Sequence, residues 1–207
     1  TKRKFKYKIG LTATIERLDK KDSKVKEWFN YNVFYYDTGE AIDDGIINNF
    51  EYINIGIHLD EKIREEYDDY TQALKNLVIA NKGIKNLIKN GGKPWFGYLG
   101  ILTKRKMLVN NYVVKFDIAK AICEKHKDDK ILVFNQFNEQ TNKLYWHLLD
   151  VGIQGAIMHS GVKDAVRQDR LADFKQDRIN ILLTTKILDE GTNIPKTDVA
   201  VIMASDS

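Results

Sequence analysis

Three apolar runs in the second half of the chain each end in residues that can form hydrogen bonds with a ligand. Ile179–Leu183 is followed by the pair Thr184–Thr185, Ile131–Phe134 by NQFNE, and Ala156–Met158 by HSG. Threonine hydroxyls and exposed N–H groups at the end of a strand can donate to phosphate oxygens. Gly191 follows in the same segment, and a glycine lets a ligand approach the backbone closely. These residues therefore indicate binding of a phosphate-bearing ligand.

The elements that would position this chemistry alternate between strands and helices. Apolar runs at residues 131–134, 156–158, 179–183 and 199–203 indicate short strands, of which those at 131–134 and 179–183 should be buried. Helical patterns cover about residues 115–127 and 163–176, and a further helix carries Leu144 and Leu148 and ends at Gly152. The alternation predicts an open α/β domain, a parallel sheet flanked by helices, from about residue 113 onward. Ligands of such a sheet bind outside the carboxyl ends of its strands.

The first half of the chain is less regular. Apolar residues alternate with others over Ile53–Leu59, which predicts a strand. Asp60 and Glu61 then begin a helical pattern, with acidic residues in its first turn. The segment KNGGKPWFG at residues 89–97 predicts a loop. Its GGK is not a phosphate-binding P-loop, because no glycine lies five residues earlier and no serine or threonine follows the lysine.

The charges are unevenly distributed along a chain whose net charge is only +4. Between residues 71 and 116 there are nine Lys or Arg residues and no Asp or Glu, and Trp95, Phe96 and Tyr98 lie among them. Cations interleaved with aromatic rings suit a phosphate backbone and stacked bases. A solvated lysine face beside a few core aromatics explains the same pattern. The candidate strand contacts are Lys82, Lys85, Lys89, Lys93, Lys104, Arg105 and Lys106.

Several classes of protein are excluded by composition. No apolar stretch approaches the about 20 residues of a membrane-spanning helix. No apolar region follows the opening TKRKFKYK, so we expect no signal peptide. Cys123 is the single cysteine, which excludes an internal disulfide and favours a reducing compartment, the cytoplasm. We expect no metal site, because no Cys, His and Asp cluster has metal-ligand spacing, and no Ser-His-Asp arrangement is suggested.

Four segments of the sequence together resemble a known family. They are LTAT at residues 11–14, ILVFNQF at 131–137, HSG at 159–161 with Arg170 and Phe174 further on, and TTKILDEGTNIP at 184–195. Their order is that of superfamily 2 helicases, where they look like motif III, motif IV, the intervening helix segment and motif V. The longer stretch KIGLTATIERLD at residues 8–19 is most similar to XPB-type DNA translocases.

The resemblance implies two RecA-like lobes with ATP and Mg²⁺ in the cleft between them and a nucleic-acid strand across both. Residues 1–57 would be the C-terminal tail of lobe one, with residues 6–13 as a strand that enters motif III. Residues 58–112 would be a helical, basic connector between the lobes. Residues 113–207 would be lobe two, truncated before motif VI. ATP and Mg²⁺ would be bound mainly by lobe-one motifs that lie outside this chain.

The same resemblance implies roles for individual residues. Asn193 stands where an aspartate is frequent in the family. For Thr184 and Gln136 the residues also allow a structural interpretation, as a strand-edge threonine and a helix cap. His159 fits a structural role at a strand end better than a catalytic base, and Arg170 fits a brace of its helix better than a phosphate contact. We expect no catalytic residue within this chain. The implied residues are Thr12, Ala13 and Thr14 for coupling ATP hydrolysis to movement, Thr185, Thr184, Gln136 and Lys186 for nucleic-acid binding, and Gly191, Asn193 and Glu190 for the nucleotide and lobe interface.

The resulting hypothesis is an ATP-dependent DNA helicase or translocase that couples hydrolysis to strand movement. We expect the chain to be an internal segment of a longer motor. It should not hydrolyse ATP alone, because the P-loop lysine, the metal site and the arginine finger of the family are not among its residues. DNA is favoured over RNA by the resemblance alone. The motor would be monomeric or part of a larger complex, in the cytoplasm or at the nucleoid.

Three alternatives stay open. One is the translocating subunit of a restriction enzyme, which shares the same motifs. Another is a nucleic-acid-binding module with a decayed ATPase. A small-molecule enzyme on a similar sheet fits least well, because a fold alone does not fix a function and the chain has no glycine-rich dinucleotide fingerprint.

Overall fold

The structure is a computed structural model that describes residues 7–10, 21–185 and 197–203. The chain divides into two compact units, Thr1–Ile55 and Gly56–Ser207. In the described part of the first unit, two short helices form, α1 (Asp22–Trp28) and α2 (Thr38–Asp43). A capping box starts α2, since the Asp37 carboxylate accepts from the Glu40 N–H and the Glu40 carboxylate accepts from the Asp37 N–H. Residues 7–10 are not in a strand, and the rest of the strand expected at 6–13 lies outside the described residues.

The strand expected at Ile53–Leu59 does not form, so that prediction is wrong. Ile53 and Ile55 are 68% and 51% exposed, and the segment carries no strand assignment. Alternating apolar residues form a strand only where a neighbouring strand satisfies the backbone and a core covers one face. Among the described residues, no strand pairs with this segment and no core covers its apolar side chains.

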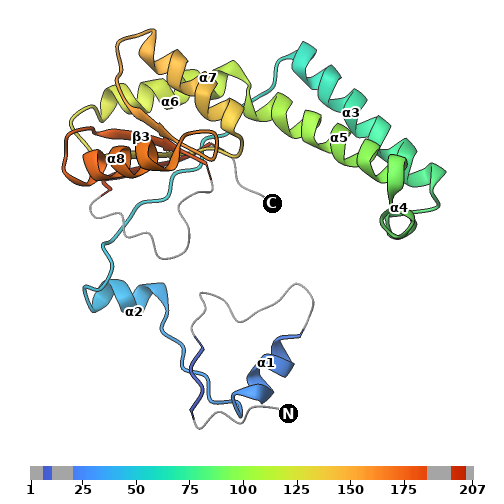
Figure 1. Ribbon diagram of the computed structural model, residues 1–207, viewed down its shortest axis with the longest axis horizontal. Helices are drawn as coiled ribbons and strands as arrows, with labels where there is room; N and C mark the ends of the chain where they lie inside the picture. The colour runs from blue at the N-terminus through green and yellow to red at the C-terminus, as the bar shows by residue number, and fades with distance from the viewer. Residues whose placement is uncertain (1–6, 11–20, 186–196, 204–207) are drawn as a thin grey trace. The chain divides into compact units, whose positions relative to one another are not determined.

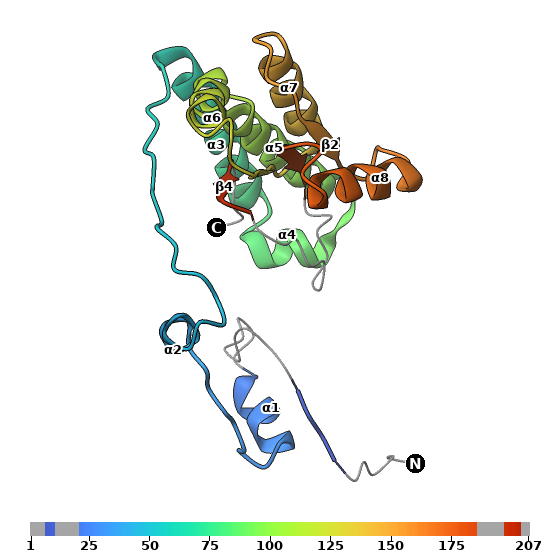
Figure 2. The same cartoon turned by 90° about the vertical axis from the view of Figure 1, so that its left-hand side faces the viewer.

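A helical hairpin opens the second unit. It consists of α3 (Glu61–Ala80), α4 (Ile84–Asn90) and α5 (Gly92–Asn110), with α3 and α5 side by side and α4 at the turn (Figures 1 and 2). The Asp60 side chain caps α3 by accepting from the Ile63 N–H at 2.9 Å. Leu74 of α3 and Leu87 of α4 are buried. The helix predicted from Asp60 onward is therefore confirmed.

The loop expected at residues 89–97 is reduced to a break at one glycine, Gly91, between α4 and α5, so its extent was wrong. Gly91 and Gly92 have φ values of 58° and 65°, a conformation that glycine adopts without steric strain. Pro94 then lies in the first turn of α5. A proline is tolerated there because first-turn N–H groups have no partner within the helix.

The predicted parallel sheet is confirmed. Its strands are β1 (Ile131–Phe134), β2 (Ala156–Met158), β3 (Ile181–Thr184) and β4 (Val199–Ile202), in the order β2-β3-β1-β4 with every pair parallel. The helices between them are α6 (Val113–Lys125), α7 (Asn138–Leu149) and α8 (Asp164–Lys175). Figure 1 shows α6 and α7 on one face of the sheet and α8 on the other.

Each face of the sheet has its own core because neighbouring strand residues point to opposite sides. Ile131 and Val133 of β1 pack under α6 and α7, where Phe116, Leu144 and Leu148 are buried. Leu132 points to the opposite face, toward Phe174 of α8. The carboxyl ends of β1, β2 and β3 are thereby held side by side by two layers of buried side chains.

Candidate nucleic-acid interface

A line of hydrogen bonds joins the carboxyl ends of three neighbouring strands, β2, β3 and β1. The Thr185 hydroxyl, just after β3, donates to Oδ1 of Asn138 at 3.1 Å. Nδ2 of Asn138, at the start of α7, donates to the Ser160 hydroxyl oxygen at 2.9 Å. Ser160 follows β2 and is exposed, whereas Thr185 is buried. The line therefore leads from a buried threonine to a hydroxyl at the surface.

Thr184 has a structural environment. Its side chain is fully buried, and its hydroxyl donates to the backbone carbonyl of Thr185 at 2.7 Å. The Thr185 N–H donates to the Met158 carbonyl at 3.4 Å, which extends the pairing of β3 with β2. Thr184 thus fixes the backbone from which the Thr185 hydroxyl projects.

Gln136 does not cap α7 with its side chain. The cap residue is Phe137, which makes no side-chain hydrogen bond. Instead, Oε1 of Gln136 accepts from Nδ2 of Asn110 at 2.7 Å, and the Gln136 N–H donates to Oε1 of Gln140 at 3.0 Å. The loop after β1 is therefore bonded both to α7 and to the last residue of α5.

Asn135 presents a buried amide at the end of β1. Its backbone N–H donates to the Thr184 carbonyl at 2.8 Å, and its side chain is 4% exposed. Neither polar atom of that side chain has a hydrogen-bond partner. Buried amides are nearly always hydrogen-bonded, so an unpaired one beside Thr184 is a candidate ligand group.

His159 is held in its neutral form by its hydrogen bonds. The Gly161 N–H donates to Nδ1 at 3.1 Å, and Nε2 lies 2.9 Å from Oδ1 of Asn142, which can only accept there. Burial lowers the pKa of His159, and the nearby Arg170 and Arg167 guanidinium groups lower it further. Arg170 itself donates to the Ile157 carbonyl of β2 at 2.6 Å, so it braces α8 against the sheet.

Lowering the pH from about 7 to about 5 should destabilise the fold through His159. Its pKa in the folded chain lies below the ordinary value of about 6.5, so below that pH the unfolded chain binds more protons. The free energy of unfolding therefore falls as the pH falls. We expect the fall to be shallower in His159→Gln, measured by urea unfolding across this range. An equally steep fall in the variant would contradict the assignment.

The basic candidates of the hairpin have different surroundings. Lys82, Lys85, Lys89 and Lys93 are exposed around α4 and the start of α5. Arg105 is half-buried, donates to the Thr71 hydroxyl at 3.2 Å and lies 5.2 Å from the Tyr67 ring centroid. Arg105 therefore also has a structural role in pairing α5 with α3.

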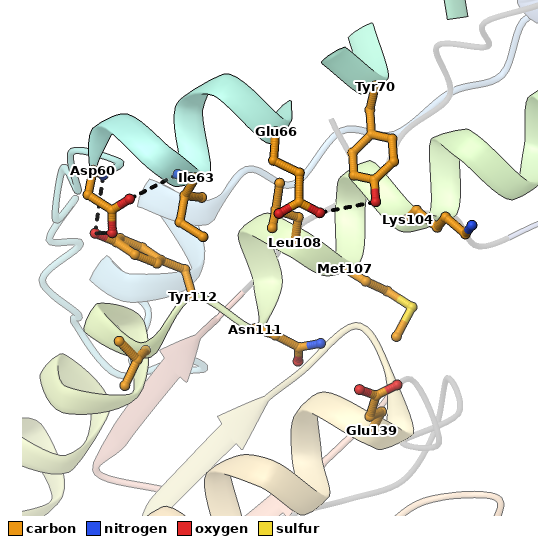
Figure 3. A pocket seen from close by; sticks show the side chains of 11 residues that line it. Asp60, Ile63, Glu66, Tyr70, Lys104, Met107, Leu108, Asn111, Tyr112 and Glu139 are labelled. Atoms are coloured by element: carbon orange, nitrogen blue, oxygen red, sulfur yellow. Dashed lines mark hydrogen bonds between the residues drawn. The ribbon is translucent and has the colours of Figure 1, made fainter. Parts of the chain in front are cut away.

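A cavity of about 550 Å³ lies at the base of the hairpin, lined by α3, α5 and the start of α7. Figure 3 shows Glu66, Lys104 and Glu139 around it, with the Tyr70 hydroxyl bonded to Glu66. Lys104 thus lines the same cavity as the carboxylates of Glu66 and Glu139. The Tyr112 hydroxyl lies 3.3 Å from Oδ2 of Asp60 and closes the base of the hairpin.

The sequence did not single out four residues that the structure brings to the site. They are Asn138 and Ser160, in the hydroxyl line, and Asn110 and Gln140, which bond the Gln136 loop. Asn138 and Ser160 belong to the strand-end segments NQFNE and HSG, so position after a strand was the available signal. Thr12, Ala13, Thr14, Lys186, Glu190, Gly191 and Asn193 lie outside the described residues.

No group of three or more His, Cys, Asp or Glu side chains among the described residues could hold a metal ion. Among the helices of residues 7–10, 21–185 and 197–203, none is both long enough and apolar enough to span a membrane.

Comparison with known proteins gives a family match for residues 114–207, to the helicase conserved C-terminal domain. The DNA 3'-5' translocase XPB2 of Sulfurisphaera tokodaii is 21% identical over 207 residues, which cover 95% of this chain and 46% of that protein. The ATP-dependent RNA helicase DBP5 of Eremothecium gossypii is 33% identical over 70 residues, covering 34% of this chain and 15% of that protein. The chain thus spans less than half the length of either relative.

A solved structure shows the same fold. The C-terminal domain of the Sulfolobus solfataricus SWI2/SNF2 ATPase superposes with a TM-score of 0.55 at 18% identity, covering 70% of this chain and 68% of that one. The four-stranded parallel sheet flanked by helices is therefore a RecA-like arrangement.

Proposed function

We propose that the chain, whose residues 114–207 match the helicase conserved C-terminal domain, is part of an ATP-dependent DNA translocase or helicase of superfamily 2. In this proposal residues 58–112 connect that domain to a first lobe, and residues 1–57 are the tail of the first lobe. The strand-end residues bind the nucleic acid. ATP would supply the free energy for strand movement when bound between the lobes.

The hydroxyl line at the strand ends is the observation that carries the proposal. Thr185 donates to Asn138, and Asn138 donates to Ser160, so every bond in the line has a fixed direction. The hydrogen of the exposed Ser160 hydroxyl is then left to donate outward, and its natural acceptor is a phosphate oxygen. Because the three residues follow three different strands, the sheet fixes their spacing.

A lobe of this kind can drive movement only if its two arrangements bind the strand differently. Thr185 is the described residue nearest in sequence to the segment assigned to the nucleotide and lobe interface, residues 190–193. A shift of that segment would act on the Thr185 hydroxyl and, through Asn138, on Ser160. The nucleic-acid side of the proposed coupling would therefore consist of Thr185, Asn138 and Ser160, which are joined by hydrogen bonds.

DNA is the proposed substrate because the match to a DNA translocase spans 95% of this chain, including the helical hairpin. RNA is the second candidate, because an RNA helicase is more similar, at 33%, over a shorter stretch. Fluorescence anisotropy can test this preference for DNA over RNA. The 207-residue chain is titrated against fluorescein-labelled DNA and RNA strands of the same sequence. We expect tighter binding to DNA. Tighter binding to RNA would reverse the assignment, and binding to neither would contradict nucleic-acid binding by this chain.

Replacing each threonine with valine, which has the same shape but no hydroxyl, should distinguish the role of Thr185 from that of Thr184. Thr185→Val removes the first bond of the hydroxyl line, and we expect affinity for single-stranded DNA to fall by about tenfold, the effect of one lost hydrogen bond. Thr184→Val removes the buried bond to the Thr185 carbonyl. It should lower the free energy of unfolding by about 1 kcal/mol and leave affinity within about twofold. Anisotropy and urea unfolding of both variants measure this, and the opposite assignment of effects would contradict these roles.

A further inference from the structure

A closed ring of three hydrogen bonds joins the helical hairpin to the strand-end loop. Nδ2 of Asn110, the last residue of α5, donates to Oε1 of Gln136 at 2.7 Å. The Gln136 N–H donates to Oε1 of Gln140 at 3.0 Å. Nε2 of Gln140 then donates back to the Asn110 carbonyl at 3.0 Å. The ring thus links α5 to the loop after β1 and to α7, across 26 and 30 positions of the chain respectively.

Two residues of the ring, Asn110 and Gln140, are buried, and their side-chain amides are fully used. Gln140 is completely buried, and both of its polar side-chain atoms take part. Asn110 is 6% exposed, and its Oδ1 accepts from the Lys115 ammonium group at 3.3 Å. The amides of Asn110 and Gln140 therefore each have one orientation that satisfies their partners, and the flipped orientation leaves a buried donor or acceptor unpaired. Such a network fixes the geometry of the loop more strictly than apolar packing would.

Apolar packing does not fill the joint between the hairpin and α7. The cavity of about 550 Å³ lies there, lined by Asn111 and Glu139, the sequence neighbours of Asn110 and Gln140 (Figure 3). The ring is therefore a hydrogen-bonded connection between the hairpin and α7 on the side where this cavity lies. Displacing the end of α5 would pull directly on the Gln136 loop and on the start of α7.

We propose that Asn110 and Gln140 are positioning residues that couple the hairpin to the strand-end site. They fix the positions of residues 135–137 and of the start of α7 relative to the end of α5. Asn138, which accepts a hydrogen bond from the Thr185 hydroxyl, lies at that start of α7. A strand bound at the tip of the hairpin and a strand bound at the sheet edge then stabilise one another. This coupling rests on the proposed nucleic-acid function, but the connection itself is a property of the free chain.

The variant Asn110→Asp breaks the ring while keeping the shape of the side chain. An aspartate still accepts from Lys115, but it has no donor for Gln136 and sets a carboxylate oxygen against Oε1. Asn76→Asp is the matched control, since Asn76 accepts from Gln72 on the exposed face of α3 and the charge change is the same. Gln140→Met, which is uncharged and of similar size, breaks the ring independently.

We expect Asn110→Asp to lower affinity for labelled single-stranded DNA by about fivefold to thirtyfold, with Asn76→Asp near wild type. The dependence of affinity on salt should keep its slope, because no phosphate contact is lost. Gln140→Met should have a similar effect, and the double variant should be little worse than either, because both break one ring. Hydrogen exchange should accelerate at the Gln136 amide and at residues 111–112, but not at Leu132 or Leu183.

Several results would overturn the coupling. If Asn110→Asp and Gln140→Met lowered the DNA affinity additively in the double variant, the two residues would not act through one ring. A changed slope of affinity against salt concentration would mean that a phosphate contact was lost instead. Exchange that rises equally in the strands would show a general loss of stability instead. If the wild-type chain binds no strand but the localised exchange pattern appears, the connection is supported and the proposed function fails. If the chain binds and both variants bind like wild type, the function stands and the coupling is wrong.

Discussion

Replacing Lys85, Lys89 and Lys93 with glutamine is expected to weaken binding of the chain to single-stranded DNA on the order of 100-fold at about 0.1 M salt. The three lysines are exposed around α4 and the first turn of α5, and residues 71–116 contain no acid that could neutralise them. Each phosphate contact on a single strand contributes about 0.7 to the slope of log affinity against log salt concentration. The triple variant should therefore reduce the slope by about 2.

A second triple variant separates this effect from net charge. Lys125, Lys127 and Lys175 are also exposed, and they precede β1 and β3, at the edge of the sheet opposite the strand ends. Their replacement by glutamine changes the charge equally and should leave the slope near wild type. Anisotropy titrations at four salt concentrations measure both variants. If both triple variants reduced the slope equally, the lysines of the hairpin would be a solvated face and not a contact surface for the strand.

The sheet was predictable because each strand has a continuous apolar sequence. Ile131–Phe134 and Ile181–Leu183 are buried on both faces, which is what an uninterrupted apolar run requires in a parallel sheet. The strand predicted at Ile53–Leu59 does not form, because alternating apolar residues are only one of the conditions for a strand. The other conditions, a partner strand and a core, depend on distant parts of the chain.

The break between α4 and α5 shows a different limit. Glycine and proline clustered at residues 91–94 were interpreted as a loop, but proline in a first turn and glycine at a helix boundary are also compatible with two helices. Which of the two forms depends on Leu87, whose complete burial anchors α4 against the hairpin. Local propensity does not contain that information.

The candidate site was predictable in position but not in connectivity. Residues that follow buried strands had to lie at one edge of the sheet, so Thr185 and Gln136 were found. Their partners were not, because Asn138 and Asn110 are 47 and 26 positions away and carry no distinguishing sequence pattern. Gln136 illustrates the difference, since a residue expected to contact a ligand is also the acceptor for α5.

Phe174→Ala is expected to lower the free energy of unfolding by about 3–5 kcal/mol, the largest effect of any single substitution proposed for this chain. Phe174 is completely buried on the last turn of α8, where its ring packs against Leu132, Met158 and Leu182. This face of the sheet is covered by α8, so a cavity left by the ring has few neighbours that can close it. The Lys130 ammonium group, 5.2 Å from the ring centroid, would also lose its aromatic partner.

Urea unfolding of three variants tests the size of this effect. Phe174→Leu retains most of the buried apolar area and should cost clearly less than the alanine variant. Val166→Ala, on an exposed face of the same helix, should cost less than about 1 kcal/mol and controls for helix propensity. Because Met158 pairs with Thr184 in the sheet, loosening this core should also loosen the strand ends. A Phe174→Ala variant with nearly wild-type stability would mean that α8 is not required to hold the site together.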